Sequence, residues 1–441
     1  MTAKATLTSR AANHSLLGSL RVPGDKSMSH RAVMFSSLAE GTSHVTGLLE
    51  GEDVMATLAA FRAMGVTAEG PDNGALTVHG VGMNGLQAPE SDLDMGNSGT
   101  AMRLMAGILA AQRFASKLIG DESLTKRPMR RVTVPLTSMG ARCATDDNGC
   151  PPIHIRGVEK LEPITYKLPM ASAQIKSAVL LAGLYADGET SVTEPAPTRD
   201  HTERMLKAYG YQCQSEKVSD TVTTIRVKGG GKLTATDIDI PADISSAAFF
   251  MVAASIVPGS RLLLEHVCVN PTRTGIIDIL KAMGADIKLI NPRAVGGEPV
   301  ADIQVSYVGL KGCEIDPELV PLAIDEFPVI CIAAACAEGQ TTVSGAEELR
   351  HKESDRISAM VEGMRAIGVD VEERRDGMLI TGGKIAGGTV ESYHDHRIAM
   401  SFAIAGAVSE NGVLINGAET VATSFPNFVE LANAAGLSID D

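Results

Sequence analysis

The chain has 441 residues, and 44% of them are apolar, which is enough for two or three domains that each bury a core. Its formal net charge is −14, which argues against nonspecific nucleic-acid binding, because such binding needs a basic face. The first residues lack the basic-then-apolar pattern of a signal peptide, and no apolar run is long enough to cross a bilayer. A cytoplasmic protein without a membrane or nucleic-acid partner is therefore expected.

The cysteines support the same compartment. There are seven of them, an odd number without a CxxC pair, which is typical of free thiols in a reducing environment. No His, Cys or carboxylate cluster has the spacing of metal ligands, so no metal is expected.

Six times, a short polar cluster runs directly into an Ala-rich apolar stretch. These openings start 71 to 81 residues apart, and a spacing this regular predicts a repeated supersecondary unit. Each stretch is typical of a buried helix with a polar N-terminus. The openings begin at Asp25, Gly96, Ala171, Ala242, Ala323 and His394.

The second half of each unit is repeated as well. A second helical pattern ends in a glycine, which predicts a left-handed cap just past the helix, and a strand-like run follows. Further strand-like runs such as TSVTE and TTVSG lie between the two helices. The pattern predicts a two-layer α/β fold with helices inside and sheets outside, and six units divide into three plus three near Pro241. The six glycines are Gly65, Gly140, Gly210, Gly284, Gly368 and Gly436.

The polar openings predict a site for an anionic small molecule, because helix N-termini carry unpaired N–H groups and partial positive charge. Lys26 and Arg31 stand five residues apart and could reach one oxyanion. Gly99 opens the next inner helix, where the lack of a Cβ lets a ligand approach the backbone. The structural alternatives are a solvated helix start for Lys26 and Arg31, a turn that merely changes the chain direction at Gly99, and an ordinary N-cap for Ser172.

Two clusters in the second half of the chain carry carboxylates. Asp325 precedes the run FPVICIAAACA, where it is either an N-cap or a tuned acid or base. In ELRHKESDR, Lys352 and Arg356 are four residues apart and are expected to share a helical face, beside Glu353. A salt-bridged surface helix is the alternative there. Arg397, at the head of an apolar stretch, needs a partner.

Together, PGDKSMSHR, GNSGTAMR, LTKRPMRR, PMASAQIKSAVLLAGL, TRDHTE, ELRHKESDR and YHDHR resemble the EPSP synthase (3-phosphoshikimate 1-carboxyvinyltransferase) family, class II, over essentially the whole chain. The resemblance implies a two-domain inside-out α/β barrel (prism) of six βαβαββ-type repeats, three per domain. It implies a discontinuous domain of residues 1–22 plus 242–441 and an inserted domain of residues 23–241, with the active site in the interdomain cleft. A monomer is expected.

The resemblance also implies an activity. Enzymes of this family transfer the enolpyruvyl group of phosphoenolpyruvate to the 5-hydroxyl of shikimate 3-phosphate and release phosphate, on the pathway to chorismate, with no cofactor. The implied catalytic residues are Asp325, Glu353 and Lys26. The implied shikimate 3-phosphate ligands are Lys26, Ser27, Arg31, Ser172, Ala173, Gln174, Arg199, Asp325 and Lys352. The implied phosphoenolpyruvate ligands are Lys26, Gly99, Arg127, Gln174, Arg356 and Arg397.

One position departs from the family pattern, and two other functions stay open. Thr423 stands where many members carry a lysine, so one cationic contact with phosphoenolpyruvate is expected to be missing. The sister transferase that uses UDP-N-acetylglucosamine typically carries a reactive cysteine in the loop that corresponds to residues 117–131, and this chain has none there. A noncatalytic anion-binding protein on the same scaffold would not need both Asp325 and Glu353.

Overall fold

The computed structural model describes residues 6–219 and 221–441, and the chain forms two compact units. The inserted unit consists of Gly24–Ile240 together with the short segment Val295–Glu298. The terminal unit, which contains both chain ends, consists of Met1–Pro23, Pro241–Ala294 and Pro299–Asp441. Residues 295–298 were expected in the terminal domain, and the repeat pattern contains no signal for their place in the inserted unit.

The six polar openings all lead into helices, as the repeat predicts. Every residue of α7 and of α10 is buried, because these helices are apolar all round and can be stable only when they are enclosed. In the terminal unit α7, α10 and α12 contact one another, and in the inserted unit α3 contacts both α1 and α5. The inner helices are α1 (Lys26–Leu38), α3 (Gly99–Leu109), α5 (Ala173–Gly183), α7 (Ile244–Ile256), α10 (Phe327–Ala335) and α12 (His396–Gly406).

The second helix of each repeat is present as well, and the six predicted glycine caps are confirmed. Each of these glycines lies two residues beyond the last helical residue with a φ between +77° and +107°, the left-handed region in which a side chain is strained. The second helices are α2 (Glu52–Ala63), α4 (Arg130–Ser138), α6 (His201–Ala208), α8 (Gly275–Ala282), α11 (Arg356–Ala366) and α13 (Phe428–Ala434). One further short α-helix is α9 (Val320–Ala323), and the 3₁₀ helices are η1 (Leu124–Lys126), η2 (Pro317–Leu319), η3 (Glu347–His351) and η4 (Ala418–Thr423).

Three sheets in the inserted unit repeat one hydrogen-bonding pattern, in which a parallel pair is followed by two antiparallel pairings. The first consists of β14 (Leu233–Thr234), β3 (Ala39–Thr46), β5 (Ala75–Val81) and β4 (Thr67–Asp72), with β15 (Ile238–Asp239) also on β3. The second consists of β6 (Leu93–Asp94), β7 (Ser116–Ile119), β9 (Ile153–Arg156) and β8 (Arg142–Ala144). The third consists of β10 (Thr165–Lys167), β11 (Glu189–Glu194), β13 (Thr223–Lys228) and β12 (Cys213–Lys217).

Three sheets also surround the helices of the terminal unit. One consists of β2 (Leu17–Leu20), β16 (Arg261–Cys268), β18 (Glu298–Ser306) and β17 (Asp286–Val295). Another consists of β19 (Gln340–Val343), β21 (Gly377–Thr381) and β20 (Asp370–Arg374). The last consists of β22 (Gly388–Glu391), β23 (Val413–Asn416), β1 (Thr6–Arg10) and β24 (Ser438–Asp440).

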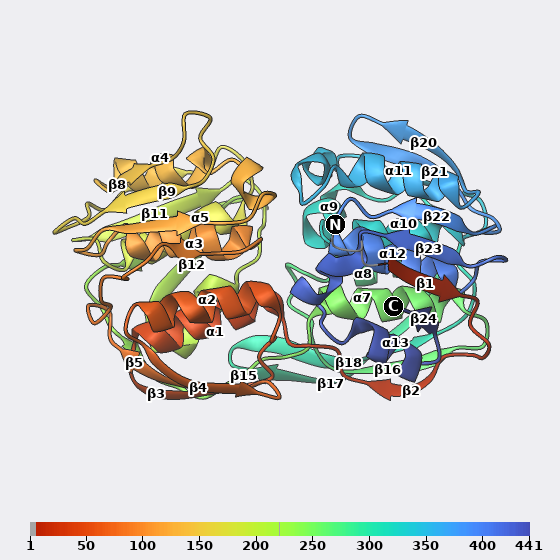
Figure 1. Ribbon diagram of the computed structural model, residues 1–441, viewed down its shortest axis with the longest axis horizontal. Coiled ribbons are helices and arrows are strands. Elements are labelled where there is room, and N and C mark those ends of the chain that lie inside the picture. The colour runs from red at the N-terminus through yellow and green to blue at the C-terminus, as the bar shows by residue number, and fades with distance from the viewer. Residues whose placement is uncertain (1–5, 220) are drawn as a thin grey trace. The chain divides into compact units, whose positions relative to one another are not determined.

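The N-terminal strands complete sheets of the terminal unit. Strand β2 pairs in parallel with β16, with Leu17 opposite Arg261. Strand β1 lies between β23 and β24. Within each unit the strands lie outside and the helices inside (Figure 1), so the fold is the inside-out α/β barrel of six repeats.

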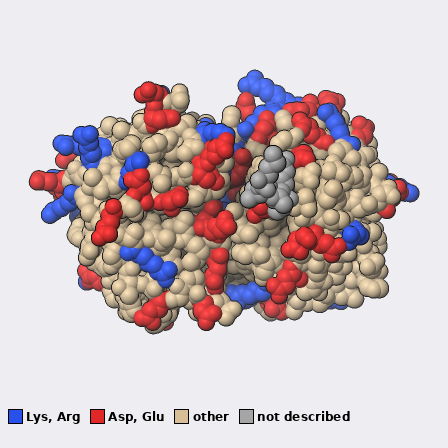
Figure 2. All heavy atoms as spheres, in the orientation of Figure 1, with Lys and Arg blue, Asp and Glu red and all other residues tan. Residues whose placement is uncertain are grey.

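The surface reflects the composition. Asp and Glu side chains are spread over the face drawn in Figure 2, and the described Lys and Arg side chains on that face form no continuous basic stripe, in keeping with the net charge of −14. Across the described residues, no helix combines the length and the apolar character that a membrane span requires.

Candidate active site

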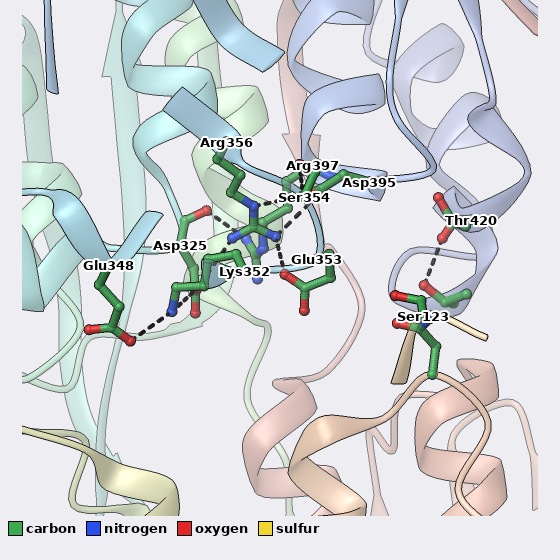
Figure 3. A network of polar contacts seen from close by, with 12 residues as sticks. Ser123, Asp325, Glu348, Lys352, Glu353, Ser354, Arg356, Asp395, Arg397 and Thr420 are labelled. Carbon is green, nitrogen blue, oxygen red and sulfur yellow. Dashed lines mark hydrogen bonds and ion pairs between the residues drawn. The ribbon is translucent and has the colours of Figure 1, made fainter. Parts of the chain in front are cut away.

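The terminal unit gathers four predicted residues, Lys352, Glu353, Arg356 and Arg397, around a fifth, Asp325, which lies in the short segment between α9 and α10 (Figure 3). The Asp325 carboxylate lies 3.5 Å from Lys352 Nζ and 3.4 Å from a guanidinium nitrogen of Arg356. The backbone carbonyl of Asp325 accepts a hydrogen bond from Arg397 Nη1 at 3.1 Å. Asp325 is not an N-cap: α10 begins at Phe327, and its cap position makes no side-chain hydrogen bond. The N-cap interpretation is therefore wrong.

Lys352 and Arg356 converge on Asp325 although they do not share a helix. The expectation of one helical face is wrong, because η3 ends at His351 and α11 begins only at Arg356. Asp355 starts the new helix by accepting a hydrogen bond from the backbone N–H of Ser358 at 3.1 Å. Lys352, whose backbone is extended, instead reaches Asp325 from the loop between the two helices.

Arg356 is the most deeply buried cation of this group, with 1% of its side chain exposed. Its Nε donates to Asp395 at 2.8 Å and its Nη2 donates to Glu353 at 2.7 Å. Burial alone lowers the pKa of this guanidinium, but Asp395, Glu353 and Asp325 outweigh the burial, so its pKa lies above the ordinary value. Arg356 is therefore a fixed positive charge.

Asp395 is the residue of this group that sequence reasoning missed. It is fully buried, pairs with Arg356, and accepts hydrogen bonds from Ser354 Oγ at 3.0 Å and from the backbone N–H of Arg397 at 2.9 Å. A single carboxylate therefore ties together three neighbours of the site. Its place directly before α12, in the motif HDHR, was the available signal, because aspartate is a preferred N-cap.

The inserted unit brings together Gly99, Arg127 and Gln174, all three of which had been predicted as ligands of one substrate. Gln174 Nε2 donates to Thr100 Oγ1 at 2.9 Å, and its Oε1 accepts from Arg103 Nη1 at 2.5 Å. A Cβ placed on Gly99 would lie 3.1 Å from Arg103 Nη1 and 3.3 Å from Arg127 Nη1. Two guanidinium groups therefore face the bare backbone of Gly99, at the N-terminus of α3.

Arg103 is a second functional candidate that sequence reasoning missed. It lies four residues after Gly99 on α3, the spacing that puts two residues on one helical face. Arg127 is held beside it by a hydrogen bond from its Nη2 to Asn97 Oδ1 at 2.6 Å. The motif GNSGTAMR contains both Gly99 and Arg103 at this four-residue spacing, but an arginine inside a helix has many possible partners.

Lys26 and Arg31 have separate partners within the inserted unit. Lys26 Nζ is ion-paired with Asp53, which had not been singled out from the sequence. Arg31 is buried, and it donates to Thr202 Oγ1 at 2.7 Å, to Ser177 Oγ at 2.9 Å and to the carbonyl of Ser27 at 3.0 Å. Burial lowers the pKa of Arg31 to about 10, so it remains a cation at neutral pH.

The remaining predicted residues lie at element boundaries of the same unit. Ser172 is the N-cap of α5 and its hydroxyl accepts from the backbone N–H of Ile175 at 3.4 Å, as its N-cap interpretation predicts. Ala173 is the first residue of that helix. Arg199 lies in the segment between β11 and α6. The positions of all three residues are therefore determined by junctions between a loop and a helix.

The comparisons with known proteins agree over nearly the whole chain. The family model described as "EPSP synthase (3-phosphoshikimate 1-carboxyvinyltransferase)" matches residues 11–431. The chain is 60% identical over 424 residues to the 3-phosphoshikimate 1-carboxyvinyltransferase of Hydrogenovibrio crunogenus, covering 96% of this chain and 95% of that protein. The solved EPSP synthase of Acinetobacter baumannii has a TM-score of 0.89 and 56% identity, covering 99% and 100% of the two chains. The enolpyruvyl transferase NikO of Streptomyces tendae shares the fold, with a TM-score of 0.77 at 15% identity over 99% of each chain.

Proposed function

The chain belongs to the EPSP synthase family, and we propose that the two groups of residues described above divide the family's reaction between them. As a member of that family, the enzyme transfers the enolpyruvyl group of phosphoenolpyruvate to the 5-hydroxyl of shikimate 3-phosphate and releases phosphate, in the shikimate pathway to chorismate. We propose further that it acts as a monomer in the cytoplasm. Seven free cysteines support the compartment, because reducing conditions keep thiols free.

Asp325 is proposed to take the proton from the 5-hydroxyl as that oxygen attacks phosphoenolpyruvate. The observation that supports this role is its setting, since Lys352 and Arg356 flank its carboxylate and Arg397 holds its carbonyl. A general base must be held in a fixed orientation toward the proton it removes. Glu353, fixed by Arg356, is proposed to handle the proton at the methylene carbon, because addition and elimination need acid–base groups at two different atoms.

The cations are proposed to bind the two phosphorylated acids. Lys26, Ser27, Arg31, Ser172, Ala173, Gln174, Arg199, Asp325 and Lys352 are the proposed ligands of shikimate 3-phosphate. Lys26, Gly99, Arg127, Gln174, Arg356 and Arg397 are the proposed ligands of phosphoenolpyruvate. Two anionic substrates repel each other, so guanidinium and ammonium groups are required to hold them in one site. We assign no role to Thr423, whose hydroxyl donates to the carbonyl of Thr420 at 2.6 Å.

Phosphate release with each acceptor supplied separately tests this proposal. We expect phosphate release when phosphoenolpyruvate is combined with shikimate 3-phosphate, and none when UDP-N-acetylglucosamine is the acceptor in place of shikimate 3-phosphate. Release only when the UDP-sugar is the acceptor would assign the chain to the sister activity. Binding of both anions without any release would indicate a noncatalytic anion-binding protein.

Replacing Lys26 with alanine is expected to weaken binding of both substrates about tenfold or more. The change removes a charge-assisted contact, and it also leaves the Asp53 carboxylate without its ion-pair partner near two anionic ligands. Calorimetric titration with each substrate measures the effect. Lys232→Ala is the matched control, because Lys232 forms an exposed ion pair with Glu40 in the same unit. A Lys26→Ala enzyme that binds either substrate with unchanged affinity would contradict its assignment to both.

The Gly99→Ala variant is expected to be less sensitive than the natural protein to glyphosate, the family's known inhibitor. Glyphosate occupies the place of phosphoenolpyruvate but is longer. The new methyl group would lie 3.1 Å and 3.3 Å from the guanidinium nitrogens of Arg103 and Arg127, which shortens the space in front of α3. Overpacking of this kind costs about 1–3 kcal/mol, and the longer ligand meets it first. Inhibition constants measured in competition with phosphoenolpyruvate on both proteins decide the matter, and equal constants would show that Gly99 does not set the pocket length.

A further inference from the structure

The inserted unit contains a lysine that no step of the reaction uses and that is fully enclosed. Lys176 on α5 has 0% of its side chain exposed, and its Nζ lies 2.7 Å from Glu203 Oε1 and 3.0 Å from Glu194 Oε2. Both carboxylates are buried as well, at 4% and 6% exposure of their side chains. Glu194 ends β11 and Glu203 lies on α6, so one ammonium group joins three elements.

A second polar connection lies directly beside the first. Ser177, the neighbour of Lys176 on α5, lies with its hydroxyl 2.7 Å from that of Thr202, the neighbour of Glu203 on α6. Arg31 donates to both of these hydroxyls, so a second buried cation joins the cluster. The cluster holds two cations and two carboxylates, and their charges balance.

Stability does not explain why this cluster is charged. Burial alone lowers the pKa of Lys176, but Glu203 and Glu194 outweigh it and keep the ammonium charged, while burial raises the pKa of Glu194. Removing charges from water costs several kcal/mol per ion, and apolar residues of similar volume often stabilise such a position equally well. A buried ion cluster does, however, restrict the geometry of the segments that carry it.

Those segments carry the proposed ligands of shikimate 3-phosphate. The backbone N–H of Lys176 donates to the carbonyl of Ser172 at 3.1 Å, which ties the cluster to the start of α5. Glu194 accepts a hydrogen bond from Thr198 Oγ1 at 2.5 Å, and Thr198 directly precedes Arg199 in the segment between β11 and α6. The cluster therefore holds both ends of the segment that carries Arg199, and it includes Arg31 through the hydroxyls of Ser177 and Thr202.

We propose that Lys176, together with Glu194 and Glu203, is a positioning residue for shikimate 3-phosphate: it holds the α5 start, the Arg199 segment and Arg31 in the arrangement that binds this anion. The proposal rests on the assignment of Ser172, Arg199 and Arg31 to that substrate. Lys176 itself, being fully enclosed, does not touch the substrate. Its effect is predicted to be larger on binding of shikimate 3-phosphate than on binding of phosphoenolpyruvate, because Gln174 is the one proposed phosphoenolpyruvate ligand at the α5 start.

Two variants of the cluster separate an effect on substrate binding from an effect on protein stability. Lys176→Met alone leaves two buried carboxylates without their cation and is expected to lower the melting temperature. The triple variant Lys176→Met, Glu194→Gln, Glu203→Gln removes the lysine together with both of its carboxylates, while Arg31 keeps its hydrogen bonds and the nearby carboxylates of Asp25 and Glu298, and it is expected to fold with a melting temperature near that of the natural protein. In this triple variant we expect the dissociation constant of shikimate 3-phosphate to rise about tenfold or more, with a smaller rise in the KM for phosphoenolpyruvate.

A more conservative variant provides the test if the triple variant does not fold. Thr198→Val removes only the hydrogen bond between the Arg199 segment and Glu194, and we expect the dissociation constant of shikimate 3-phosphate to rise several-fold. Lys207→Met, at an exposed position on α6, is the matched control and should bind normally. If a folded triple variant, or Thr198→Val in its place, binds shikimate 3-phosphate with natural affinity, the proposal is overturned.

The failure of this inference and the failure of the site assignment give different results. Arg199→Ala measures the assignment directly, because it removes the proposed ligand itself. Natural affinity for shikimate 3-phosphate in Arg199→Ala would remove the premise. Weakened binding in Arg199→Ala with natural binding in the triple variant and in Thr198→Val would remove only the positioning role.

Discussion

Turnover is expected to fall about 100-fold or more when Asp325 is replaced by asparagine, while shikimate 3-phosphate continues to bind. Asparagine keeps the shape of the side chain but cannot accept the proton of the 5-hydroxyl. Lys352 and Arg356 lie 3.5 Å and 3.4 Å from this carboxylate, and both remain in place as cations beside the neutral amide. The measurement is kcat from phosphate release, together with a calorimetric titration of shikimate 3-phosphate.

Glu318, an exposed residue on η2 nine residues before α10 begins, provides a control of the same chemistry in the same unit. Glu318→Gln also converts a carboxylate into an amide, but at an exposed position outside the proposed site, and is expected to keep natural turnover. Near-natural turnover in Asp325→Asn would remove Asp325 from the acid–base role. Loss of shikimate 3-phosphate binding in that variant would indicate a binding role in its place.

Replacing Asp395 with alanine is expected to lower the free energy of unfolding by about 3–5 kcal/mol, because it leaves the buried Arg356 guanidinium without its principal partner. The same change removes the acceptor for Ser354 Oγ and for the backbone N–H that opens α12. Urea denaturation followed by circular dichroism measures the loss. Asp370→Ala, at an exposed position on β20, is the control and should change stability by less than about 0.5 kcal/mol.

The Asp395 effect also has a defined pH dependence. Burial acts to raise the pKa of this carboxyl, but Arg356 outweighs it, so the folded-state pKa lies below the ordinary value. A depressed folded pKa contributes stability above the unfolded pKa of ~4, and that contribution is lost as the pH falls through the folded pKa. The natural protein and Asp395→Ala should therefore differ most at neutral pH and approach each other below pH ~4. A constant difference at every pH would show that the carboxylate charge is not what stabilises Arg356.

The repeat and the polar residues that open each unit could be predicted from the amino-acid sequence. Regular spacing of the six polar openings predicted six inner helices, and all six are present, because an Ala-rich stretch that is apolar all round is stable only when enclosed. The glycine after each second helix predicted a left-handed cap, and Gly65 and Gly284 have φ values of +90° and +91°. These features depend on residues close together in the chain, so local preferences decide them.

Tertiary structure alone decided which charges meet. Lys352 and Arg356 were expected on one helical face. Asp355 instead caps a new helix that begins at Arg356, so Lys352 reaches Asp325 from a loop and Arg356 reaches it from a helix. Arg103 and Gln174 are 71 residues apart in the sequence but hydrogen-bonded in the fold. Lys176 lies in the polar opening of α5, and its two carboxylates come from a strand and from another helix. Sequence periodicity predicts which face of an element is buried, but it carries no information on which distant side chain lies opposite, because that depends on how the helices and sheets pack.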